Sequence, residues 1–119
     1  MNENSILINR IVEGIQEKKG KRITVVDMSN IPNTVFSHFV ICQAESSTQV
    51  HAIAESVRRY VSKTLKIKPF STDGYENAEW IIIDYGDVLV HIFRPEAREF
   101  YRLEELWEDA VITEIADLD

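Results

Sequence analysis

The feature that most constrains the fold is a change of hydrophobic period in the middle of the chain. Residues 36–44 are rich in β-branched and aromatic side chains, which predicts a strand. Residues 46–67 instead repeat apolar side chains every three or four positions, which predicts an amphipathic helix. Residues 80–93 return to a strand pattern. Because a strand, a helix and a further strand in this order need a crossover connection, we expect a sheet that contains a parallel pair.

The flanking segments predict the order α-β-β-α-β-β-α. Residues 5–20 have apolar side chains at helical spacing, and residues 22–28 read as a short buried strand. Gly86 predicts a tight turn that divides residues 80–93 into a hairpin, because glycine readily adopts positive φ. The fold class that we expect is α/β, with one mixed sheet flanked by helices.

The segments after residue 67 are less regular. Residues 68–79 are polar and predict a loop. Residues 95–110 predict a helix that begins at Pro95, a residue favoured in the first turn. On this helix Phe100 and Trp107 share one face, which predicts that both are buried. Residues 110–119 form an acidic tail that either frays or adds an edge strand.

The length predicts one domain that spans residues 1–119, because domains cluster at about 100–150 residues. The chain carries 13 basic and 20 acidic side chains, a net charge of −7. This charge disfavours nucleic-acid and membrane-surface binding as the main activity. The charge is uneven, with +4 in residues 1–68 and −11 in residues 69–119. Such asymmetry indicates a partner of opposite charge.

Targeting and redox signals are weak. Cys42 is the only cysteine and lies within a strand pattern, which predicts a buried structural thiol and a reducing compartment. The first residues lack the features of a signal peptide, and no stretch has about 18 consecutive apolar residues. We therefore expect a cytoplasmic protein.

The residues that carry chemistry do not form a recognisable catalytic motif, so we expect no enzyme, cofactor or metal. Ser46 and Ser47 stand where a helix begins, so capping explains them. The three histidines, His38, His51 and His91, lack the close spacing of a zinc motif, although convergence in space stays open.

Asp84 and Asp87 supply the main alternative to a binding protein. Two carboxylates near a strand end can hold magnesium for phosphoryl or nucleotidyl transfer. However, aspartate is also an ordinary turn residue, and the glycine-rich phosphate loops are absent. The alternative function is a nucleotidyltransferase-like enzyme that binds magnesium and nucleotide through these two residues.

Aromatic and acidic residues alternate between residues 80 and 109, a composition typical of binding surfaces with aromatic anchors. If the face of the sheet that carries His91 and Phe93 is not covered, this pattern predicts an acidic, aromatic patch for a basic partner.

These residues also carry a family resemblance. The run WIIIDYGDVLVHIF from Trp80 to Phe93, followed by REFYRLEELW from Arg98 to Trp107, closely resembles the signature of the Iojap family, the ribosomal silencing factor family RsfS. FVICQAESSTQVHAIAESV upstream also fits. The resemblance covers nearly the whole chain.

The resemblance implies a nucleotidyltransferase-like fold without that activity, and a bacterial factor that represses translation when nutrients are scarce. It further implies binding to the large ribosomal subunit through its ribosomal protein numbered fourteen, steric blocking of the small subunit, and homodimers in some members.

Together, the charge and the resemblance predict that the chain contacts a basic ribosomal protein and makes little direct contact with RNA. We expect Arg98 to pair with a carboxylate within the chain. The predicted partner-binding residues are Trp80, Asp84, Tyr85, Asp87, His91, Phe93, Tyr101, Glu104 and Glu105. An adaptor with a different basic partner is a further alternative.

Overall fold

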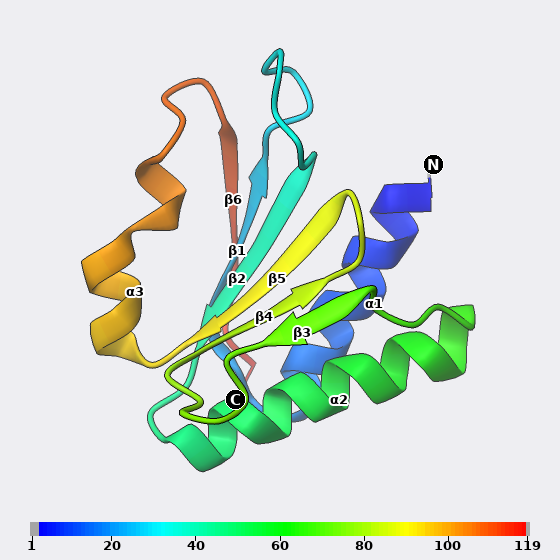
Figure 1. Cartoon of the computed structure of the whole chain (residues 1–119), viewed down its shortest axis with the longest axis vertical. Helices are drawn as coiled ribbons and strands as arrows, with labels where there is room; N and C mark the ends of the chain where they lie inside the picture. Colours follow the sequence, from blue (N-terminus) through cyan, green and yellow to red (C-terminus); the bar gives the residue numbers. More distant parts are fainter. Residues whose placement is uncertain (1–2, 119) are drawn as a thin grey trace.

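The computed structural model describes residues 3–118 and has one mixed sheet with helices on both faces (Figure 1). Its helices are α1 (Glu3–Glu17), α2 (Ser47–Leu65) and α3 (Pro95–Tyr101), followed by the short 3-10 helix η1 (Leu103–Glu105). Its strands are β1 (Lys21–Asp27), β2 (His38–Gln43), β3 (Ser71–Asp73), β4 (Trp80–Asp84), β5 (Val88–Phe93) and β6 (Val111–Ile115).

The six strands lie in the order β3-β4-β5-β2-β1-β6. β2 and β5 are parallel, with His38 opposite Val88, and the other neighbouring strands are antiparallel. The predicted α/β class and the parallel pair are confirmed. β5 pairs with β2 on one side and with β4 on the other. β4 and β5 form the predicted hairpin.

One predicted segment differs from the structure, and for another the structure decides between two expected outcomes. The predicted loop at residues 68–79 contains β3, which pairs with β4 through the register Thr72 to Ile83. The acidic tail forms the edge strand β6 along β1, which confirms one of the two expected outcomes. Neither strand is obvious in the sequence, because each pairs on one side only and is mostly exposed.

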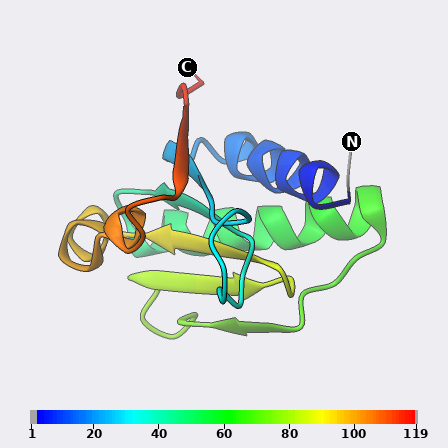
Figure 2. The ribbon, with the colours of Figure 1, turned by 90° about the horizontal axis from the view of Figure 1, so that it is seen from above.

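α1 and α2 cover one face of the sheet, and α3 lies on the other side of it (Figure 2). The core under α1 and α2 is aliphatic, with Ile11, Ile53 and Ile81 fully buried. The two helices approach closely at Gly14, where a Cβ atom would lie 3.0 Å from the Cα of Val57. Cys42 is buried in this core, as predicted.

The predicted boundaries of α2 are confirmed. The Ser46 hydroxyl accepts a hydrogen bond from the Gln49 backbone N–H at 3.1 Å, which caps the first turn. The helix ends at Leu65, and Lys66 takes a left-handed conformation before Pro69.

Candidate functional site

The second face of the sheet is covered, so the condition for an open aromatic patch across it is not met. α3, η1 and the segment around Trp107 pack over β5 and β2, burying Phe39, Phe93 and Leu103. His91 is also buried, and Tyr85 lies within the core of the opposite face.

Tyr85, His91 and Phe93 therefore do not present their side chains to a partner in this structure, and their expected exposure is wrong. Alternation along a strand sets only which side chains share a face. Whether that face is covered depends on α3, which is distant from β2 and β1 in the sequence.

His91 takes part in a stack of rings on this face. The indole N–H of Trp80 donates a hydrogen bond to His91 Nδ1 at 3.0 Å, which places the imidazole proton on Nε2. Burial lowers the pKa of His91 to about 3, because the charged form loses its solvation. The Trp80 ring also stacks on Phe93, with 5.0 Å between their centroids. His91 is a neutral structural residue at neutral pH.

The predicted helix at residues 95–110 is interrupted. α3 ends at Tyr101 because Arg102 takes a left-handed conformation, with φ of 46°, and the chain turns into η1. Trp107 still packs on the second core, as predicted. Phe100 does not, and 78% of its surface is exposed, so its predicted burial is wrong. A continuous helix would have kept both side chains on one face.

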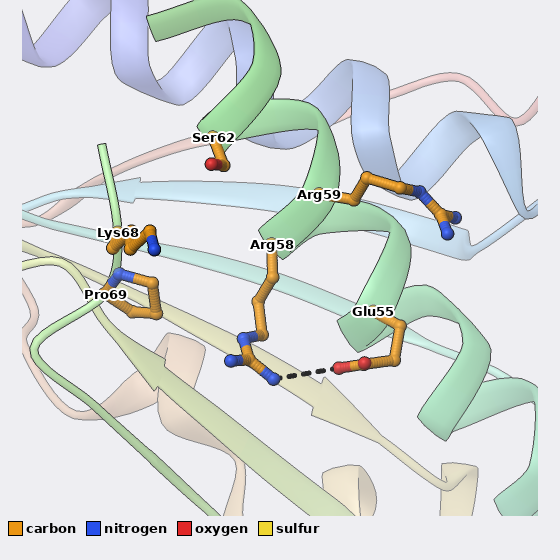
Figure 3. Close-up of a pocket in the computed structure, with 6 residues that line it drawn as sticks. All are labelled: Glu55, Arg58, Arg59, Ser62, Lys68 and Pro69. Carbon is orange, nitrogen blue, oxygen red and sulfur yellow. Dashed lines mark hydrogen bonds and ion pairs between the residues drawn. The ribbon is translucent and has the colours of Figure 1, made fainter. Parts of the chain in front are cut away.

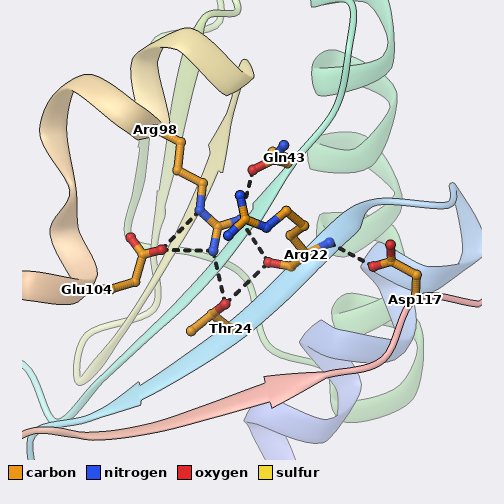
Figure 4. Close-up of polar contacts among 6 residues, drawn as sticks. All are labelled: Arg22, Thr24, Gln43, Arg98, Glu104 and Asp117. Atoms are coloured by element: carbon orange, nitrogen blue, oxygen red, sulfur yellow. Dashed lines mark hydrogen bonds and ion pairs between the residues drawn. The ribbon is translucent and has the colours of Figure 1, made fainter.

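Arg98 ties the end of α3 to the sheet (Figure 4). Its guanidinium, buried at 5% exposure, donates to the Arg22 carbonyl at 2.7 Å, the Thr24 hydroxyl at 2.9 Å and the Gln43 side chain at 3.2 Å. It also pairs with the Glu104 carboxylate at 2.9 Å. The prediction that Arg98 pairs within the chain is confirmed. This network fixes where α3 presents its outer side.

The outer side of α3 carries aromatic rings that lead from the sheet to solvent. The Tyr101 ring lies 4.5 Å from the Trp80 ring, and the Phe100 ring lies 5.0 Å from the Tyr101 ring. Trp80 is half-buried, whereas Tyr101 and Phe100 are exposed. Because each ring already packs on its neighbour, these side chains lose little conformational entropy when a partner covers them.

The same segment also carries carboxylates. Arg102 forms ion pairs with Glu99 and with Glu105, whereas Glu104 faces the buried Arg98. We call this set the α3 surface: Trp80, Glu99, Phe100, Tyr101, Glu104 and Glu105. Four of its members are predicted site residues. The sequence pattern predicts Phe100 in the core and does not single out Glu99. α3 ends at the left-handed residue Arg102, and this break has no clear signal in the sequence.

Asp84 and Asp87 lie at the opposite end of β5 from the α3 surface, beside the turn between β4 and β5. Asp84 accepts a hydrogen bond from the Gly86 backbone N–H at 2.7 Å, and Gly86 has φ of 94°. Asp87 is exposed, and its carbonyl accepts from the Ser37 N–H. Both residues thus shape or flank a turn, and the nine predicted residues do not form one surface.

The geometry does not favour the alternative with magnesium. Within residues 3–118, no three histidine, cysteine, aspartate or glutamate side chains come together, so the structure brings no further protein ligand of this kind to Asp84 and Asp87. The histidines are dispersed: His38 lies 3.5 Å from Asp27, His51 packs on Tyr75, and His91 is in the second core.

No helix in residues 3–118 is long and apolar enough to cross a membrane.

Comparisons with known proteins agree across the whole chain. A family model described as "Ribosomal silencing factor during starvation" matches residues 2–119. The ribosomal silencing factor RsfS of Halalkalibacterium halodurans is 36% identical over 112 residues, covering 94% of each chain. That of Bacillus subtilis is 36% identical over 120 residues, covering 100% of this chain and 96% of the relative.

A solved structure has the same fold. The crystal structure of a Chromobacterium violaceum protein superposes with a TM-score of 0.83 at 30% identity, and covers 89% of this chain and 87% of its own. The predicted family is confirmed by sequence along the full length and by structure. This chain is a member of the ribosomal silencing factor family RsfS.

Proposed function

We propose that this chain silences ribosomes by docking its α3 surface on a basic protein of the large ribosomal subunit, the ribosomal protein numbered fourteen. Once bound, the domain blocks association with the small subunit by occupying the space that the small subunit needs. Repression of translation under nutrient limitation follows, because subunits that do not join do not initiate. The role in ribosome silencing comes from the family, and the partner and mechanism are the proposal.

The observation that carries the placement of the surface is the exposure of Phe100, next to Tyr101 and Trp80. Binding hot spots are aromatic side chains that a partner can desolvate fully. Glu99 and Glu105 are exposed carboxylates on the same short segment as Phe100 and Tyr101, and each would exchange its ion pair with Arg102 for a lysine or arginine of the partner. The same carboxylates repel phosphate groups, so the α3 surface itself makes little contact with RNA.

Phe100→Ala tests this placement, and the chain offers a matched control. Phe70 is another phenylalanine of similar exposure, 81% against 78%, but it lies near the turn at Gly86. Truncation of a hot-spot ring costs about 2 kcal/mol or more, which is roughly a 30-fold loss of affinity. We therefore expect Phe100→Ala to leave the large-subunit fraction of a sucrose gradient, and Phe70→Ala to stay in it.

The same gradients test the mechanism. When small subunits are added, the parent chain should lower the amount of joined ribosomes, and Phe100→Ala should not. Equal binding of the parent and of Phe100→Ala would reject the α3 surface. Loss of binding in Phe70→Ala alone would place the contact at the turn that carries Asp84 and Asp87. Binding of the parent chain without any effect on joining would reject the steric mechanism.

A further inference from the structure

Four of the ten basic residues in the first 68 positions lie in a row on one side of α2 and on the segment that follows it. Arg59, Lys63 and Lys66 succeed one another at steps of four and three residues, so they lie along one side of the helix. Lys68 extends the row beyond the helix end. All four side chains are exposed.

These four cations lack carboxylate partners within residues 3–118, since none of them forms an ion pair there. Glu55, the acidic residue within α2, is already engaged by Arg58 at 3.0 Å and by the Tyr75 hydroxyl at 2.8 Å. The row therefore has an uncompensated charge of about +4 on a protein whose net charge is −7.

A hollow of about 420 Å³ adjoins the row (Figure 3). It lies between α2 and the chain after it, and its lining includes Arg59, Ser62 and Lys68 as well as Glu55 and Arg58, which pair with each other. Arginine and lysine from two separate segments, with a hydroxyl between them, are groups that bind phosphate oxygens.

We infer that this basic row, formed by Arg59, Lys63, Lys66 and Lys68, binds the phosphate backbone of RNA. The cations follow one another about one helical turn apart, and a linear row of charges fits a linear polyanion. The polar residues Ser62, which is half-buried, and Thr64, which is exposed, lie between them. Protein partners are usually held by clustered aromatic anchors like those of the α3 surface, whereas the four side chains of the row are all cationic. The exposed Phe70 follows Lys68 by two residues and is not part of the row.

The basic row and the α3 surface lie on different faces of the sheet, because α2 covers one face and α3 the other (Figure 2). The chain can therefore contact RNA through α2 while the α3 surface is turned toward a basic protein. The inference does not rest on the proposed docking, since the row and its lack of partners are properties of this chain alone.

The test measures binding of the full chain to a fluorescently labelled 20-base-pair RNA duplex by anisotropy, at several salt concentrations. Four phosphate contacts predict that log K falls against log salt with a slope of about −3 to −4, on the scaling known for duplex DNA. The variant Arg59→Glu with Lys63→Glu should bind at least 10-fold more weakly, and its slope should be shallower by about 2.

The control is Lys18→Glu with Lys19→Glu, which changes the net charge by the same amount. These exposed lysines follow α1, and the Lys18 carbonyl accepts from the Gln49 side chain near the start of α2. That end of α2 lies about 20 Å from Lys63 at 1.5 Å per residue. The control should keep the slope and lose less than about threefold in affinity.

Several outcomes overturn the inference. The first is that the parent chain does not bind the RNA at 50 mM salt. The second is that both double variants lose the same RNA affinity. The third is that polyglutamate binds to the same row more tightly than RNA does. The milder pair Arg59→Gln with Lys63→Gln is measured alongside, so that misfolding of the reversed variant does not decide the result. The RNA probe contains no ribosomal protein, so failure here leaves the proposed docking standing.

Discussion

The two faces of the sheet are covered by cores of different composition. The face under α1 and α2 has a core of aliphatic side chains such as Ile11, Ile53 and Ile81. The face under α3 is richer in aromatic rings and buries the polar side chains of Thr24, His91 and Arg98. Two long helices cover the first face, whereas a 7-residue helix and a 3-10 turn cover much of the second.

This difference indicates that the two faces are stabilised by different interactions. The first face is stabilised by burial of apolar surface, an interaction that has no preferred direction. A short helix contributes little such burial, and so Arg98 and its hydrogen bonds hold it in place. We expect apolar packing to dominate the stability of the first face, and the hydrogen bonds of Arg98 to dominate both the stability of the second face and the position of the α3 surface.

The largest expected effect comes from Arg98→Ala, which removes the guanidinium that joins α3 to β1 and Glu104. Deleting one partner of a buried ion pair costs about 3–5 kcal/mol. Arg102 is a matched control on the same helix end, since its ion pairs are exposed and contribute about 1 kcal/mol or less. Urea unfolding of both variants checks the comparison, and similar losses for the two arginines would contradict it.

Ile53→Ala probes the first face. Its side chain is fully buried between α2 and the sheet, and such truncations cost about 2–5 kcal/mol. Leu103→Ala is the counterpart on the second face. In hydrogen exchange, Ile53→Ala should lower protection throughout the sheet, whereas Leu103→Ala should mainly expose the amides of α3. A uniform loss in both variants would show that the faces are not separable.

His91 gives the second face a dependence on pH. Its pKa is about 3 when folded, against 6.5 as the ordinary value, so the unfolded chain binds a proton more readily. Stability is unaffected above pH 6.5 and falls as the pH drops from 6.5 toward 3. From pH 7 to pH 5 we expect a loss of about 2 kcal/mol. His91→Gln should remove most of this drop in urea titrations, and an unchanged drop would exclude His91 as its source.

Phe100→Ala should have the smallest effect on stability, within about 0.5 kcal/mol, because its ring is exposed. Combined with a loss of large-subunit binding, this result would separate docking from folding. Thermal unfolding of the parent and the variant provides the measurement. A loss of several kcal/mol would mean that Phe100 serves the second core after all.

The sequence was informative where period and composition act locally. The apolar spacing of α1 and α2, the hairpin around Gly86 and the Ser46 cap all depend on neighbours within a few residues. β3 was missed because a three-residue edge strand is defined by its partner β4. The acidic tail left two outcomes open, since β6 forms only along β1, about 90 residues earlier.

The candidate site was predicted only in part, for the same reason. Of the nine predicted residues, Trp80, Asp84, Asp87, Tyr101, Glu104 and Glu105 are exposed or half-exposed, as a partner-binding role requires. Tyr85, His91 and Phe93 are not, because their burial depends on segments that are distant in the chain. The family signature includes core and surface residues alike, so a match to it does not separate the two.

The sequence by itself determined the α/β class, the family and the division of charge into a basic first part and an acidic second part. The tertiary structure decided which aromatic rings reach solvent and where the charges gather. The physical reason is that period and composition are local, whereas burial depends on what packs over a face. Here the left-handed Arg102 and the buried Arg98 turn Phe100 outward, and the fold places the basic row on the other face.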